Sequence, residues 1–306
     1  MPIRIYATSH TDTGRVRERN EDCAYASAHD DTALLIVADG MGGYRAGDRA
    51  SELTVETIRS ELELLFGPSS GQPTVKLKSR RDGAGERTTV ELPETAASEH
   101  YGRFLTLAVR HANDAVINYG QDHRDARGLG STVTVAVITR NRAYFANVGD
   151  SRSYLFRKGI LRVITRDHSL VARLVESGEI EPDEVYAHPK RNLIYRSLGA
   201  DRGDIDVDLF EEELHSGDLI FLCSDGLWEK VRPAEIIAIL QQESDMDAIC
   251  KQLITHANNQ GGEDNISISI ARYSDDEVAP AAAADIAEAD TGEVAATSSE
   301  DKTQTT

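Results

Sequence analysis

Acidic residues stand next to apolar segments in several distant parts of this sequence. Asp39 begins the run Asp-Gly-Met-Gly-Gly directly after the apolar segment 33–38, so a carboxylate follows a segment typical of a buried strand. Four further loops share this acidic character, and they contain Glu21-Asp22, Asp150, Asp225 and Asp264. A single Asp at a strand end usually makes only a turn, but five such loops in one chain predict one shared site.

A shared site of this kind has an electrostatic problem. Carboxylates crowded together repel, and only bound cations or raised pKa values make such a cluster stable. Carboxylate oxygens suit hard divalent ions, whereas the three cysteines, Cys23, Cys223 and Cys250, lack the spacing of a zinc site. The residue types therefore favour metal-ion chemistry with oxygen ligands.

The composition limits the class of protein. The chain has 306 residues, 40% of them hydrophobic, which is enough for one large core. A formal net charge of -19 argues against a nucleic-acid partner, because phosphate contacts need clustered Lys and Arg. The odd cysteine count points to a reducing compartment, and the sequence has neither a signal peptide nor an apolar stretch of about 18 residues. We therefore expect a cytoplasmic monomer without membrane contact.

Hydrophobic periodicity predicts the elements that would position the carboxylates. Segments typical of strands lie at 34–38, 132–138, 143–148, 153–156, 219–222 and 266–270. Helical spacing of apolar residues predicts helices at 48–66, 99–119, 169–177, 234–241 and 246–258. Antiparallel strands separated by helices indicate an α+β domain, with helices packed outside stacked sheets.

Two segments interrupt this pattern. Residues 67–98 are rich in Gly, Pro and Ser at both ends. This composition is compatible with two interpretations of the segment, an inserted hairpin arm and a disordered loop. Residues 274–306 carry nine acidic residues against one lysine, contain no aromatic residue, and cannot bury enough apolar surface to order themselves. We expect a catalytic domain over 1–273 and a disordered acidic Ala/Thr-rich tail over 274–306.

The chain resembles the bacterial metal-dependent serine/threonine protein phosphatases, the PPM family of the protein phosphatase 2C type. The resemblance spans about residues 5–272 and rests on motifs in the order and approximate spacing of that family. These motifs are Arg17-Glu18-Arg19-Asn20-Glu21-Asp22, Asp39-Gly40-Met41-Gly42-Gly43, Gly128-Leu129-Gly130-Ser131-Thr132, Val148-Gly149-Asp150-Ser151-Arg152, Ser224-Asp225-Gly226-Leu227-Trp228 and Asp264-Asn265. The resemblance implies a central antiparallel β-sandwich flanked by helices, in four αββα layers.

The resemblance also implies a metal centre built from the acidic loops. Asp39 would bridge two tightly bound Mn²⁺ or Mg²⁺ ions, and the Gly40 carbonyl would bind one of them. Asp225 and Asp264 would be further ligands of the first ion, and Glu21 and Asp22 those of the second. A third, weaker ion would be held by Asp150 together with Asp225.

The reaction implied is attack of a metal-bridging hydroxide on the phosphorus of phosphoserine or phosphothreonine. Arg17 would hold the substrate phosphate, because its planar fork suits phosphate oxygens. Met41 stands where many relatives place a histidine that protonates the leaving group, so the general acid stays open, with a metal-bound water as our hypothesis. Residues 166–198 resemble the family's flap, in which His188 is expected to cap or pack and Arg191 is a second candidate for the phosphate contact.

Three functions are compatible with this resemblance. The first is an active phosphatase that acts on phosphorylated proteins and opposes a Hanks-type serine/threonine kinase. The second is a binding module that keeps only the fold, but it predicts the loss of Asp39, Asp225 or Asp264, and all three are present. The third is a phosphatase for an anti-sigma-factor antagonist, whose relatives usually lack part of the segment 17–22 that is intact here. We favour the first.

Overall fold

Two antiparallel sheets form the centre of the computed structural model, which describes residues 3–42, 46–63, 94–200 and 204–275. The first sheet contains, in spatial order, β1 (Arg4–Asp12), β11 (Ile266–Ser274), β10 (Leu219–Cys223), β7 (Arg152–Arg157) and β8 (Ile160–Val163). The second contains β2 (Asp22–His29), β3 (Thr32–Met41), β5 (Val133–Thr139), β6 (Arg142–Val148) and β9 (Asp208–Glu213), with β4 (Gly130–Ser131) paired to the end of β3.

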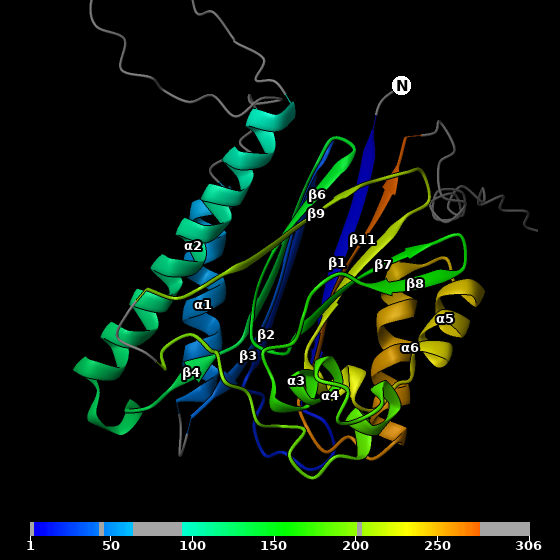
Figure 1. The fold of residues 1–306 in the computed structure, drawn as a ribbon. Coiled ribbons are helices and arrows are strands. Elements are labelled where there is room, and N and C mark those ends of the chain that lie inside the picture. Colours follow the sequence, from blue (N-terminus) through cyan, green and yellow to red (C-terminus); the bar gives the residue numbers. More distant parts are fainter. Residues whose placement is uncertain (1–2, 43–45, 64–93, 201–203, 276–306) are drawn as a thin grey trace, which may run out of the picture. The chain divides into compact units, whose positions relative to one another are not determined.

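Helices cover the outer faces of both sheets (Figure 1). The second sheet packs against α1 (Gly47–Leu62) and α2 (Glu94–Asp122), and the first against α5 (Pro233–Gln242) and α6 (Met246–Asn259). The shorter elements are α3 (Leu170–Glu176), α4 (Asp225–Trp228), η2 (Arg124–Ala126) and η3 (Pro182–Ala187). The predicted α+β sandwich with flanking helices is confirmed.

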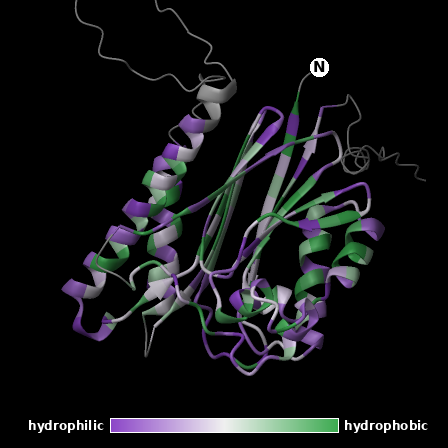
Figure 2. Cartoon of the chain, in the orientation of Figure 1, coloured by the Kyte–Doolittle hydropathy of each residue, from purple (hydrophilic) through white to green (hydrophobic). Residues whose placement is uncertain are grey.

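The residues of β3 explain why the sheets stack in this way. Leu34 and Ile36 face the helices α1 and α2, while Leu35 and Val37 face the other sheet, and all four are fully buried. Successive side chains of a strand point to opposite faces, so a strand covered on both sides reads as a continuous apolar run. Hydrophobic residues are accordingly concentrated in the strands and in the helix faces turned toward them (Figure 2).

Several elements differ from the prediction. The strands β1, β2, β8 and β9 and the short helix α4 were not predicted, because their sequences are polar, small or too short to show periodicity. Residues 94–98, expected in the inserted arm, belong to α2, and Ser274, expected in the tail, ends β11. The rest of the predicted arm and tail, 67–93 and 276–306, lies outside the described residues.

The strand order brings the acidic loops to one end of the sandwich. The start of β2 lies beside the end of β3, and β10 ends beside the start of β11. The end of β6 and the start of β7 flank the loop that carries Asp150. No helix in the described part of the chain is long and apolar enough to cross a membrane.

Candidate metal centre

Asp22 and Asp39 face each other across the pair β2 and β3. Asp22 is buried, and its Oδ2 accepts a hydrogen bond from Ser224 Oγ at 2.7 Å. The Asp39 N–H donates to Thr132 Oγ1 at 3.0 Å, and the Thr132 N–H donates to the Asp39 carbonyl at 2.8 Å. These bonds fix the backbone of Asp39 at the point where its side chain meets that of Asp22.

Glu21 is held against the start of α1 by close backbone packing. Its carbonyl accepts the Gly40 N–H at 3.0 Å and the Ser51 Oγ–H at 2.6 Å. A Cβ atom on Gly40 would overlap the Gly47 carbonyl, and a Cβ on Gly47 would meet the Glu21 carboxylate at 2.6 Å. Gly40 therefore requires glycine, whereas a side chain at Gly47 would displace the Glu21 carboxylate. This close packing brings the Gly40 carbonyl and the Glu21 carboxylate to the end of β3.

Asp225 and Asp264 are brought together by another close approach of backbones. Asp225 begins α4, and a Cβ atom on the following Gly226 would overlap the Asn265 carbonyl oxygen. The Asp264 Oδ1 accepts the Asn265 N–H at 2.9 Å, which keeps this turn closed. The two carboxylates thus project from loops that touch each other.

The loop of Asp150 is fixed on both sides of the residue. The Gly149 N–H donates to His168 Nδ1 at 3.0 Å, and the His168 N–H donates to the Gly149 carbonyl at 2.9 Å. The Trp228 indole N–H donates to the Asp150 carbonyl at 3.0 Å. Gly149 has a φ of +108°, which favours glycine, and its place beside Thr132 leaves no room for a Cβ. Asp150 is therefore buried and held by main-chain contacts.

The charges of these groups act on one another. Burial raises the pKa of Asp22 to about 7 and the pKa of Asp150 to about 7. Burial also raises the pKa of Asp39 far above its ordinary range, and the charges of Asp22, Asp225, Asp150 and Asp264 raise it further. The pKa of Asp225 is raised in the same way, first by burial and then by Asp150. The carboxylates therefore lie close enough together for the charge of one to raise the pKa of another.

The donor set fits a hard divalent cation. Asp22 Oδ1 and Asp225 Oδ1 are buried and have no hydrogen-bond partner among the described residues. A buried carboxylate oxygen without a donor is costly, and a cation with oxygen ligands would satisfy both atoms. No group of three or more Asp, Glu, His or Cys side chains in the described ranges is already arranged to hold a metal ion. Two of the site carboxylates accept hydrogen bonds from protein side chains: Asp22 from Ser224, and Asp264 from Arg17.

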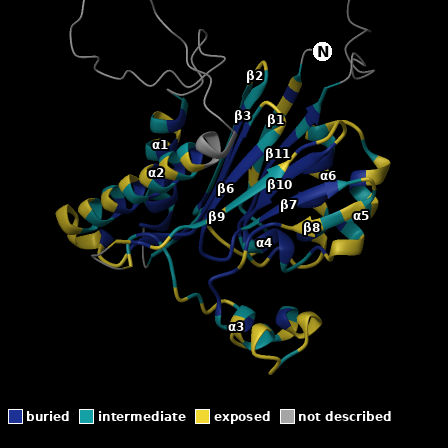
Figure 3. Cartoon of the chain, turned by 45° about the horizontal axis from the view of Figure 1, so that its top comes forward, coloured by how far each residue is buried: buried dark blue, intermediate teal, exposed yellow. Residues whose placement is uncertain are grey.

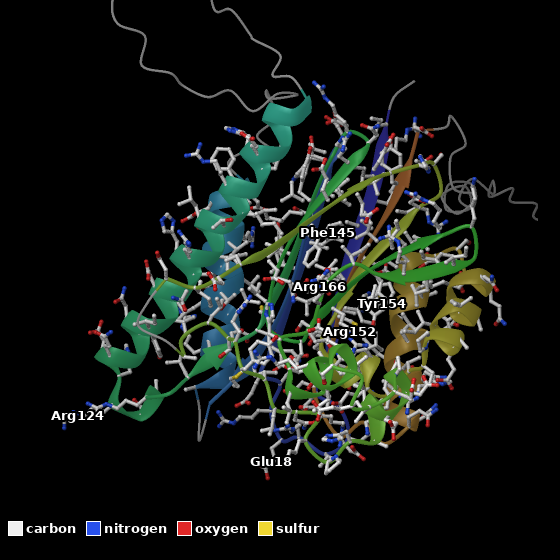
Figure 4. All side chains as sticks on the ribbon, viewed as in Figure 1. Glu18, Arg124, Phe145, Arg152, Tyr154 and Arg166 are labelled. Carbon is white, nitrogen blue, oxygen red and sulfur yellow. The ribbon has the colours of Figure 1, made fainter. Side chains whose placement is uncertain are left out.

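Arg17 lies beside this cluster. Its Nη2 donates to Asp264 Oδ2 at 2.7 Å, and half of its side chain is exposed. Figure 4 labels the next residue, Glu18, at the end of the molecule where the α3 and α4 segments lie. A guanidinium that is both exposed and next to the carboxylates is placed to contact an anion arriving from solvent.

The flap segment 166–198 contacts the same end of the molecule. Arg191 Nε donates to Glu229 Oε2 at 2.8 Å, directly after α4. His188 Nδ1 accepts the Lys190 N–H at 3.2 Å, in agreement with the predicted capping role. Figure 3 shows α3 and the following turns projecting from the body with many exposed residues. The flap is thus an exposed surface attached near the carboxylates.

Some residues that shape the site had no role in the sequence-based prediction. Ser224, Thr132 and Trp228 were present in the motifs, but their hydrogen bonds reach across the fold to distant backbone or carboxylate atoms. His168 was noted only as part of the flap. The sequence signal for each was its position next to an acidic residue or inside a glycine-rich motif.

The chain is similar in sequence and in fold to known protein phosphatases. A family model described as "Protein phosphatase 2C" matches residues 8–268. The serine/threonine phosphatase stp of Listeria innocua is 34% identical over 265 residues, 86% of this chain and 94% of the relative. The crystal structure of the Mycobacterium tuberculosis serine/threonine phosphatase PstP/Ppp has a TM-score of 0.71 and 32% identity, and covers 90% of this chain and 100% of its own. A structure of the PstP catalytic domain in complex with two manganese ions has a TM-score of 0.69 and 31% identity. The match covers 89% of this chain and 100% of the chain in that structure.

The raised pKa values of Asp22 and Asp150 predict a pH-dependent effect of metal ions on stability. In the unfolded chain these carboxyls titrate near 3.8, whereas in the metal-free folded state they titrate at about 7. The folded state therefore binds more protons between these values, and its stability falls as the pH rises through about 7. A divalent ion replaces those protons, so its stabilising effect should be larger at pH 8 than at pH 5.5.

The measurement is the melting temperature with EDTA and with excess Mn²⁺ at both pH values. We expect the Mn²⁺-induced increase to be several degrees larger at pH 8, and Asp150→Asn to reduce that difference. An increase that is equal at both pH values, or larger at pH 5.5, would contradict the assignment.

Proposed function

Because the chain belongs to the protein phosphatase 2C family, we propose that it hydrolyses phosphoserine and phosphothreonine in proteins with the help of Mn²⁺ or Mg²⁺. One observation carries the proposal: Asp22 faces Asp39 across two strands, and the charges of Asp22, Asp225, Asp150 and Asp264 all raise the pKa of Asp39. A binding module without catalysis has no need of so costly a cluster. The intact carboxylate set therefore favours the enzyme.

The residues divide between two tight ion sites and a weaker third one. Asp39 would be the shared ligand of both tight sites, and the Gly40 carbonyl would bind one of the two ions. The proposed outer ligands are Asp225 and Asp264 for the first ion, Glu21 and Asp22 for the second, and Asp150 with Asp225 for the third. The relative PstP, crystallised with two manganese ions, supports this count of tight sites.

Two divalent ions held by these carboxylates would supply an activated water for attack on phosphorus and would offset the charge of the phosphate. The protein's own part is to hold the carboxylates in place, and the contacts of Thr132, Ser224 and His168 support this role. Arg17 binds the phosphate oxygens. Met41 cannot donate a proton, so the leaving alkoxide takes its proton from water.

The physiological substrates are phosphorylated proteins. A phosphate on a protein side chain reaches the site from outside, which agrees with the exposure of Arg17 and of the flap. A phosphatase of this kind opposes a kinase that phosphorylates serine and threonine, and we propose a Hanks-type kinase as that counterpart.

Asp39→Asn tests the metal centre. The amide removes the charge shared by both tight sites, so turnover of p-nitrophenyl phosphate and phosphothreonine peptides should fall by at least about 10²-fold. Calorimetric titration should show weaker Mn²⁺ binding. The control is Asp31→Asn, the same substitution at the other end of the β2–β3 hairpin, which should leave both values unchanged. Undiminished turnover by metal-free parent protein would refute the proposal.

Arg17→Ala tests the phosphate contact. Every proposed metal ligand is kept, so the affinity for Mn²⁺ should not change. KM for phosphate esters should rise about tenfold or more, because a charge-assisted hydrogen bond is worth about 1.5–3 kcal/mol. Inhibition by inorganic phosphate should weaken in parallel. Arg17→Lys should restore binding only in part, and Arg19→Ala, an exposed neighbour, serves as the control. If phosphate binds Arg17→Ala as tightly as the parent, Arg191 becomes the candidate.

Asp150→Ala tests the weaker site. Because Asp150 is assigned to neither tight site, the two tight Mn²⁺ sites should persist in calorimetry. Turnover should fall, and the Mn²⁺ concentration needed for half-maximal rate should rise. Loss of both tight sites would show that Asp150 belongs to the two-metal core.

A further inference from the structure

Asn265 follows the proposed ligand Asp264 and is buried, with 5% of its surface exposed. Its side chain makes three hydrogen bonds, all to main-chain atoms of the segment 13–21. Nδ2 donates to the Thr13 carbonyl at 2.9 Å and to the Arg19 carbonyl at 2.8 Å. Oδ1 accepts the Glu21 N–H at 2.8 Å. One buried amide thus uses both of its donor hydrogens and its acceptor on a single loop.

The bonded positions enclose the segment that carries Arg17. Thr13 and Arg19 stand at the two ends of this segment, which we call the arginine loop (residues 13–19). The side chains from Arg15 to Arg19 are all exposed. The loop therefore has few apolar anchors, and polar contacts must fix the position of Arg17.

The arginine loop has two further attachments to the segment before β11. The Arg15 N–H donates to the Gly262 carbonyl at 2.7 Å. Gly14, at a φ of +81°, lies so close to the Asp264 carbonyl that a Cβ atom there would overlap it. Both contacts fix the first part of the loop. Among the hydrogen bonds in the described part of the chain, only those of the Asn265 side chain connect the start of the loop to its end.

We propose that Asn265 is a positioning residue that sets the place of Arg17, and through Glu21 the place of the neighbouring carboxylate, relative to Asp264. This inference rests on the proposed phosphatase function. Asp264 and Asn265 are adjacent in sequence, so one turn holds the Arg17 partner and the amide that orders the Arg17 loop. Aspartate at 265 keeps the shape but cannot donate to the two carbonyls, and alanine keeps neither donor nor acceptor.

The test compares Asn265→Ala with Asn113→Ala in the full chain at saturating Mn²⁺. Asn113 is a similarly buried asparagine on α2, whose Oδ1 accepts the Gly199 N–H at 2.9 Å. For Asn265→Ala we expect KM for a phosphothreonine peptide and Ki for inorganic phosphate to rise on the order of 10–100-fold, the usual effect of losing a residue that orients a ligand. Asn113→Ala should lower the melting temperature but change neither constant by more than about twofold.

A double-mutant cycle separates positioning from general destabilisation. Because Asn265 acts through Arg17, adding Asn265→Ala to Arg17→Ala should raise KM far less than it does in the parent. Asn265→Asp, which keeps the volume of the side chain, should behave like Asn265→Ala in both backgrounds. It also serves as the test variant if the alanine variant does not fold.

Limited proteolysis measures the order of the arginine loop independently of enzyme activity. Arg15, Arg17 and Arg19 are trypsin sites inside the arginine loop, so Asn265→Ala and Asn265→Asp should be cut there faster than the parent and Asn113→Ala. Protected trypsin sites together with an unchanged KM would overturn the proposal, as would full additivity with Arg17→Ala. Absence of metal-dependent hydrolysis by the parent would instead count against the proposed function.

Discussion

Repulsion among buried carboxylates is the constraint on which this end of the molecule depends. Asp22, Asp39, Asp150 and Asp225 all have raised pKa values, and burial is the largest cause for each. The fold provides too few donors to offset this cost, since oxygen atoms of Asp22 and Asp225 stay without partners among the described residues. A fold that keeps such a cluster is adapted to divalent cations, which supply the missing positive charge.

Close contact between backbones is what holds the cluster together. Gly40 against Gly47 and Gly226 against Asn265 approach so closely that any side chain would force the strands or loops apart. Two hydrogen bonds between Gly149 and His168, one to the imidazole ring and one from the His168 N–H, add a third fixed point. The proposed ligands are therefore positioned by the rigid sandwich and its short connections, as the small geometric tolerance of a metal site requires.

The sequence predicted the centre of this arrangement better than its periphery. Asp39 could be found because β3 is covered on both faces and reads as an apolar run that ends at a carboxylate. β9, with the sequence Asp-Leu-Phe-Glu-Glu-Glu, could not, because an edge strand is defined by its neighbour β6 and not by its own residues. Asn265 and His168 act through hydrogen bonds to the main chain of distant segments, and such contacts leave no periodic pattern in a sequence.

Metal binding and phosphate binding place opposite demands on the residues that we assign to these two roles. Asp22 and Asp150 are almost fully buried, so packing fixes them, whereas half of the Arg17 side chain is exposed. A phosphate carried by another protein can be reached only by an exposed group, and an exposed group gains little order from burial. Order must then come from hydrogen bonds to the backbone beneath it. The buried Asn265 amide meets this need, because it binds both ends of the arginine loop from the turn that also carries Asp264.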